Sequence, residues 1–145
     1  MKRSLIIPEA ITWLNTPFHH GGRLKNVGCD CAALPVEVSI ALGDEVEDVF
    51  GYDKFPSALQ FKKTVEQHMY LIDLKDVKIG DCLIFAFDIE PQHIAFITQV
   101  NPMRILHAYS LAGKVVEHPM TDGWYKKLRG CYKYKNIEED MGEVK

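Results

Sequence analysis

The sequence lacks both a long apolar run and a cluster of charges of one sign. None of its 145 residues belongs to an apolar stretch near the roughly 18 residues needed to cross a bilayer, so we expect no membrane partner. Seventeen Lys and Arg against twenty Asp and Glu give a formal charge of −3. A general nucleic-acid-binding surface needs clustered positive charge, so we expect no nucleic-acid partner either.

The N-terminal stretch also lacks the pattern of a secretion signal. Residues 1–14 begin with two basic residues, but Pro8, Glu9 and Thr12 interrupt the apolar stretch, and no small-residue cleavage site follows. We therefore expect no signal peptide and a protein made in the cytoplasm.

Cysteines are few, and their spacing fits neither a zinc site nor a disulfide framework. Cys29 and Cys31 have one residue between them, whereas structural zinc sites usually have two to four, and no second close Cys or His pair completes four ligands. Disulfide frameworks are typical of short secreted chains. We expect four reduced thiols, no metal and no cofactor.

The hydrophobic pattern predicts an α+β fold with a helical first half and a strand-rich second half. With short connections throughout, the strands are expected to form one antiparallel sheet of about five strands. We expect a single domain over residues 1–136, an acidic, flexible tail over 137–145 and an acidic loop at 44–48. The predicted helices cover residues 7–14, 32–42 and 58–69, the last after a capping box at 57–60, and the strands cover 82–87, 93–99, 104–109, 114–117 and 128–134.

Cys31 is the thiol whose position favours chemistry. It lies where the helix over residues 32–42 is predicted to begin, with Asp30 as a natural N-cap. Free backbone N–H groups and the helix dipole there are expected to lower the pKa of a thiol and to stabilise an oxyanion. The positions of the other cysteines do not favour a reactive thiol. Cys82 and Cys131 fall in apolar strand patterns that favour packing, and Cys29 has no evident role.

A cysteine nucleophile needs a base, and two of the six histidines are predicted to lie together. If the turn at Asn101-Pro102 centres a hairpin, Ala95 faces His107. His93 and His107 then share one face of the sheet as diagonal neighbours within roughly 8 Å. A slip of one residue would separate them.

The same register places Thr98 opposite Arg104. Of the remaining histidines, His68 lies near the predicted end of a helix and His118 stands beside Pro119. We expect both at the surface.

Four sequence blocks, in order, resemble the NlpC-type cell-wall cysteine peptidases. Residues 16–22 and 28–34 are similar to the opening of that family, a Thr-Pro-Tyr segment ending in Gly-Gly and then Gly-x-Asp-Cys-Ser-Gly-Leu. Residues 80–85 resemble its Gly-Asp-Leu-Val-Phe-Phe strand. Residues 93–97 and 105–108 resemble the strands that carry the catalytic histidine and the third polar residue. The order agrees from about residue 9 to 134, nearly the whole chain.

This resemblance implies a papain-like α+β fold and a cysteine peptidase. Cys31 would be the nucleophile, His93 the general base and His107 the residue that orients His93. The substrate would be the stem peptide of peptidoglycan, cut between D-γ-glutamyl and a diamino acid. No metal would be needed.

The sequence around Cys31 looks most like the members encoded by tailed phages and prophages. Gly28-Cys29-Asp30-Cys31, and His19-His20 before the glycines, carry this likeness. It implies a tail-associated peptidase, with other phage tail proteins as possible partners, assembled into a tail and acting on the host wall.

Departures from the family pattern concern the substrate pocket more than the nucleophile. Phe18 stands where the family has tyrosine, so a hydroxyl near the nucleophile is missing, and His19 or His20 could supply a polar group instead. Ala32-Ala33 replace Ser-Gly after the cysteine. The candidate substrate-binding residues are Phe18, His19, His20 and Asp30.

Three alternatives stay open. The chain could be an inactive tail-assembly or structural protein that retains the fold and works by binding. It could use the same residues for acyl transfer, or on an amide outside peptidoglycan. It could also be a metal-binding module.

Overall fold

A computed structural model describes residues 1–45, 58–87 and 92–140, and the side chains of residues 58–60 lie outside this description. The predicted capping box at 57–60 and most of the predicted acidic loop at 44–48 therefore lie outside the described residues. None of the described helices is long and apolar enough to cross a membrane.

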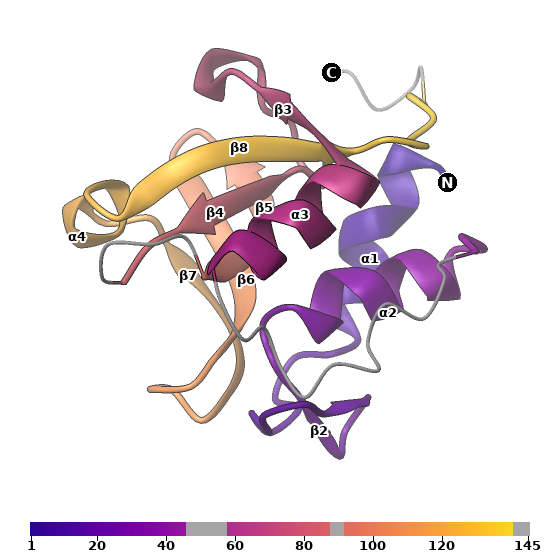
Figure 1. The fold of residues 1–145 in the computed structure, drawn as a ribbon, viewed down its shortest axis with the longest axis vertical. Coiled ribbons are helices and arrows are strands. Elements are labelled where there is room, and N and C mark those ends of the chain that lie inside the picture. The colour runs from indigo at the N-terminus through magenta and orange to yellow at the C-terminus, as the bar shows by residue number, and fades with distance from the viewer. Residues whose placement is uncertain (46–57, 88–91, 141–145) are drawn as a thin grey trace.

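The centre of the fold is an antiparallel sheet of six strands in the order β3-β8-β4-β5-β6-β7 (Figure 1). The predicted α+β class with an antiparallel sheet is confirmed, with six strands rather than about five. In chain order the strands are β3 (Met69–Ile72), β4 (Cys82–Phe85), β5 (His93–Val100), β6 (Met103–Tyr109), β7 (Lys114–Pro119) and β8 (Leu128–Tyr134).

The strand that was not predicted is β3, which begins at Met69, the last residue of the predicted third helix. Helix α3 (Ala58–His68) stops one residue before the predicted end, and Met69 pairs with Tyr134 of β8. Met69 fits the apolar spacing of the helix, but Tyr70 and Leu71 are exposed in the strand. Pairing with a distant strand overrides the local helical preference here.

Helices α1 (Ile6–Ile11), α2 (Ala33–Ala41) and α3 pack on one face of the sheet (Figure 1). Pro35 is the third residue of α2, so it lies in the first turn, where a missing backbone donor costs little. Gly43, with a φ of +95°, stops the helix as predicted.

The opposite face of the sheet carries a second apolar cluster, which includes Phe85, Ala95, Ile97 and Ile105. Trp124 of the short helix α4 (Asp122–Tyr125) packs against it. The remaining elements are small: η1 (Arg3–Leu5), β1 (Arg23–Leu24) paired with β2 (Gly28–Cys29), and η2 (Leu74–Asp76).

The β5–β6 hairpin has the predicted register in the part nearest the two histidines. Phe96 pairs with Leu106 and Ile97 with Ile105, which is the alignment that places Ala95 opposite His107. A bulge after Ile97 then shifts the pairing, so that Arg104 faces Gln99 instead of the predicted Thr98.

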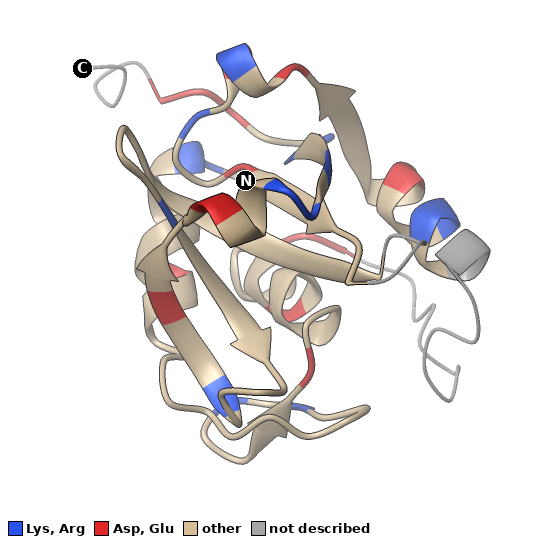
Figure 2. Cartoon of the chain, turned by 90° about the vertical axis from the view of Figure 1, so that its left-hand side faces the viewer, with Lys and Arg blue, Asp and Glu red and all other residues tan. Residues whose placement is uncertain are grey.

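The two ends of the described chain lie beside each other (Figure 1). Arg3 forms ion pairs with Asp81 at 2.8 Å and with Glu139 at 2.6 Å, and the hydroxyl of Ser4 donates to the carboxylate of Asp140. Residues 138–140 of the predicted flexible tail are therefore bonded to the N-terminal segment. In the view of Figure 2, the Lys and Arg positions along the cartoon are interspersed with the Asp and Glu positions.

Candidate active site

The predicted catalytic residues Cys31 and His93 line one open cleft of about 320 Å³. Its walls come from four regions: the loops before α2, the segment just after β4, the start of β5 and the turn after β6. The lining residues are Phe18, His20, Asp30, Cys31, Ala32, Phe87, Gln92, His93 and Ser110.

Asp30 positions Cys31 just before α2. One carboxylate oxygen accepts the Ala33 N–H at 2.9 Å, and the other accepts the Gly21 N–H at 2.8 Å. The first bond satisfies a free donor at the helix start, although the N-cap position itself is Ala32 and not the predicted Asp30. The second bond ties the preceding loop to the helix. Asp30 lines the cleft, but both of its oxygens already have backbone partners.

The environment of the Cys31 thiol favours the protonated form. Its S–H donates to the carbonyl oxygen of Gln92 at 3.8 Å. Burial and the Asp30 carboxylate raise the pKa of the thiol to about 12, while the backbone N–H groups of Ile94 and Cys31 lower it. The lowered pKa expected from the start of the helix is therefore not found, because desolvation outweighs the backbone donors.

His93 and His107 are in direct contact. Nε2 of His93 lies 2.5 Å from Nδ1 of His107, and both side chains are buried. Burial lowers the pKa of His93 to about 3 and that of His107 to about 2, so both rings are neutral at pH 7. Since Nε2 of His93 is engaged, Nδ1 is the nitrogen left to act in the cleft.

His118 is a third member of this histidine cluster, and its contact with His107 was not predicted from the sequence. Its Nε2 lies 2.8 Å from Nε2 of His107, and its Nδ1 lies 2.9 Å from the carbonyl oxygen of Pro119. His118 was predicted to lie at the surface, but it is half-buried. Strand β7 continues past the predicted end at residue 117, and pairing of His107 with Val116 brings the next residue on that face beside His107.

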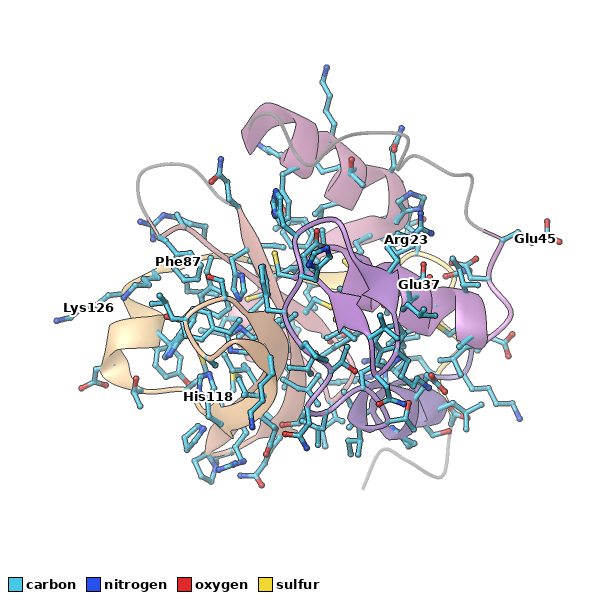
Figure 3. The ribbon with its side chains drawn as sticks, turned by 90° about the horizontal axis from the view of Figure 1, so that it is seen from below. Arg23, Glu37, Glu45, Phe87, His118 and Lys126 are labelled. Atoms are coloured by element: carbon cyan, nitrogen blue, oxygen red, sulfur yellow. The ribbon has the colours of Figure 1, made fainter. Side chains whose placement is uncertain are left out.

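Aromatic rings surround the three histidines. The Trp124 ring lies 6.1 Å from that of His93, 5.1 Å from that of His107 and 5.4 Å from that of His118. Tyr109 stacks on His107 at 5.1 Å. Figure 3 shows His118 and Phe87 on the half of the molecule that carries α4, away from Arg23 and Glu37.

Three of the four predicted substrate-binding residues line the cleft: Phe18, His20 and Asp30. His19 is exposed and does not line the cleft. Its Cβ atom lies against Gly28 of β2. His68, predicted at the surface, is half-buried beside a small apolar cavity between α2 and α3.

The other three thiols are buried and unpaired: Cys29, Cys82 and Cys131. Cys29, for which the sequence suggested no role, is a residue of β2 that packs in the apolar core. Burial raises the pKa of Cys29 to about 12 and that of Cys131 to about 11. Within the described residues, no three His, Cys, Asp or Glu side chains are arranged to hold a metal ion.

No family model and no curated protein sequence matches the chain. Solved structures do match. An NLP/P60 family protein, described as similar to lipoprotein, from Staphylococcus aureus has a TM-score of 0.67 at 19% identity, over 90% of this chain and 40% of that one. The fold is similar to that of the NlpC/P60 proteins. The chain spans less than half the length of that relative.

Two further neighbours are described as peptidoglycan hydrolases. The NlpC/p60 domain of SagA has a TM-score of 0.65 at 20% identity, over 90% of this chain and 97% of that one. RipB from Mycobacterium tuberculosis has a TM-score of 0.64 at 18% identity, over 90% of this chain and 63% of that one. At these identities the likeness shows the shared fold.

Proposed function

We propose that this chain is a cysteine peptidase that hydrolyses an amide bond in the stem peptide of peptidoglycan. The observation that carries the proposal is the shared cleft of Cys31 and His93, with Nε2 of His93 held by buried His107. Two structural neighbours described as peptidoglycan hydrolases support the substrate class. The bond between D-γ-glutamyl and a diamino acid is the one that the sequence resemblance implies.

The reaction would begin from a neutral thiol and a neutral imidazole. Nδ1 of His93 takes the Cys31 proton as sulfur attacks the amide carbonyl, which forms a carbon–sulfur bond and a tetrahedral oxyanion. Backbone N–H groups before α2 are the candidate donors to this oxyanion. His93 then gives the proton to the leaving amine as the carbon–nitrogen bond breaks. Water, deprotonated by His93, attacks the thioester, releases the carboxylate and restores the thiol.

The tail-associated role is the finer part of the proposal. It rests on the likeness of residues 19–22 and 28–31 to phage and prophage members of the family. In that role the protein would be made in the cytoplasm, assembled with other tail proteins and act on the host wall. Co-purification with tail particles that digest peptidoglycan would support it, and absence from purified particles would contradict it.

The deciding experiment is digestion of purified peptidoglycan by the wild type, by Cys31→Ala and by Cys131→Ala as a matched control. Mass spectrometry of the released peptides identifies the bond. We expect wild type and Cys131→Ala to release fragments ending in D-glutamate, and Cys31→Ala to release none.

Other results would support the alternatives. Equal release by wild type and Cys31→Ala would reject the enzyme. Binding to peptidoglycan without any release would favour an inactive tail protein. Transfer of an acyl group, or fragments with another terminus, would change the reaction or the bond. Stoichiometric zinc in the purified protein would favour a metal-binding module.

A further inference from the structure

The two buried histidines and the half-buried His118 form a line that ends on a backbone carbonyl. From the cleft outward, the contacts run from His93 to His107, from His107 to His118, and from His118 to the carbonyl oxygen of Pro119. A carbonyl oxygen only accepts hydrogen bonds. This last contact therefore requires a proton on Nδ1 of His118.

The positions of the other protons follow one by one. A neutral imidazole carries one proton, so Nε2 of His118 must accept, and the Nε2–H of His107 must donate to it. Nδ1 of His107 then has only a lone pair, and it accepts the Nε2–H of His93. Nδ1 of His93 is left without a proton, as a general base requires.

We propose that His118, held by the Pro119 carbonyl, is a positioning residue that sets the tautomers of His107 and His93 and so keeps His93 ready to accept a proton. This role for His118 rests on the proposed cysteine-peptidase function. A donor in place of Nε2 of His118 would reverse both hydrogen bonds and place a proton on Nδ1 of His93.

The surroundings of His93 and His107 favour the neutral imidazole at both. His93 and His107 are 4% and 0% exposed, and burial lowers the pKa of both. Trp124 of α4 lies against all three rings.

The test is nitrogen NMR of the full chain labelled with ¹⁵N-histidine, which separates protonated from unprotonated ring nitrogens. In the wild type at neutral pH we expect protons on Nε2 of His93, on Nε2 of His107 and on Nδ1 of His118. A proton on Nδ1 of His93 in the wild type would overturn the proposal, whether or not the protein cleaves peptidoglycan.

Two substitutions at the same position, with opposite hydrogen-bonding capacity, separate the tautomer effect from loss of packing. His118→Glu supplies only acceptors to His107, whereas His118→Lys supplies only donors. We expect His118→Glu to keep the wild-type tautomers and His118→Lys to move the His93 proton to Nδ1. The rate of Cys31 alkylation by iodoacetamide should stay within about 3-fold of wild type in the first and fall about 10-fold or more in the second.

Both readouts are independent of the substrate. If the tautomers and alkylation rates follow the expectation but no peptide is released from peptidoglycan, the substrate proposal fails and the role of His118 stands. If the two variants show the same tautomers and the same alkylation rate, the role of His118 fails while the proposed peptidase is untouched.

Discussion

The Cys31 thiol donates to the carbonyl oxygen of Gln92, the residue directly before His93, at 3.8 Å. A thiolate could not donate this hydrogen bond, because it has no proton to give. The raised pKa of Cys31 and the lowered pKa of His93 point the same way. The resting site therefore pairs a neutral thiol with a neutral imidazole, and the proton moves when the substrate is attacked.

The first prediction concerns the pH dependence of Cys31 alkylation. Iodoacetamide should label Cys31 before Cys29, Cys82 and Cys131, because Cys31 lines an open cleft while the others are buried. The rate should be low near pH 6.5 and rise steadily above about pH 8, because the pKa of Cys31 is raised to about 12. Mass spectrometry of the labelled peptides follows each thiol separately.

A different profile would contradict the neutral pair. A high and constant rate from about pH 5 to 7 would show a thiolate–imidazolium pair like that of thiols with depressed pKa values. Unfolding in urea is the control, since it should make all four cysteines react at similar rates.

Much of the active site could be predicted because it depends on local features of the chain. Asp30 and Cys31 stand just before a largely apolar stretch that becomes α2, and a short hairpin turn aligns His93 with His107. Such signals depend on spacing within a few residues. They predict which side chains meet, whereas the pKa of Cys31 depends on burial by distant segments.

The second prediction separates two roles of Asp30. Asp30→Asn keeps an acceptor for the Ala33 N–H and loses the acceptor for the Gly21 N–H, so it should cost about 1 kcal/mol of unfolding free energy. Asp30→Ala loses both and should cost about 2 kcal/mol or more. Urea denaturation measures the difference.

Asp30→Asn also removes a negative charge that raises the pKa of Cys31. Alkylation of Cys31 at pH 8 should therefore be faster in this variant than in the wild type. A slower or unchanged rate in a folded variant would show that the carboxylate does not set the pKa of the thiol.

The third prediction is a loss of stability in mild acid. In the unfolded chain a histidine has a pKa of about 6.5, whereas those of folded His93 and His107 are lowered to about 3 and about 2. Below pH 6.5 the unfolded state binds protons that the folded state does not. The free energy of unfolding should fall by about 1 kcal/mol per pH unit for each histidine as the pH drops from about 6 to 4.

His107→Gln is the matched comparison for this effect. It removes one of the two titrating groups and should give a shallower pH slope of the unfolding free energy, whatever its stability at pH 7. Equal slopes for the variant and the wild type would mean that His107 does not resist protonation in the folded state.

What the sequence could not predict depends on contacts between distant segments. Strand β3 forms because Met69 finds Tyr134 across the sheet, although its own spacing continues a helix. His118 joins His107 because β7 runs two residues further than its apolar pattern. Trp124 reaches the histidines from a four-residue helix with no signal in the periodicity.

The fourth prediction concerns the contact between the two ends of the chain. Arg3 is 7% exposed, and its guanidinium makes two hydrogen bonds to Glu139 and one to Asp81. Glu139→Ala removes both hydrogen bonds and the ion pair that Glu139 gives this buried guanidinium, and it should cost about 1–2 kcal/mol of unfolding free energy. The cost should be smaller than for a fully buried ion pair, because Glu139 is partly exposed.

Glu138→Ala is the control, because the Glu138 side chain is largely exposed while its backbone carbonyl accepts the Arg3 N–H and is kept. It should change the unfolding free energy by less than about 0.5 kcal/mol. Urea denaturation of both variants distinguishes an end segment that belongs to the fold from an acidic tail. If Glu139→Ala were as neutral as Glu138→Ala, the Arg3–Glu139 ion pair would contribute nothing to the stability of the fold.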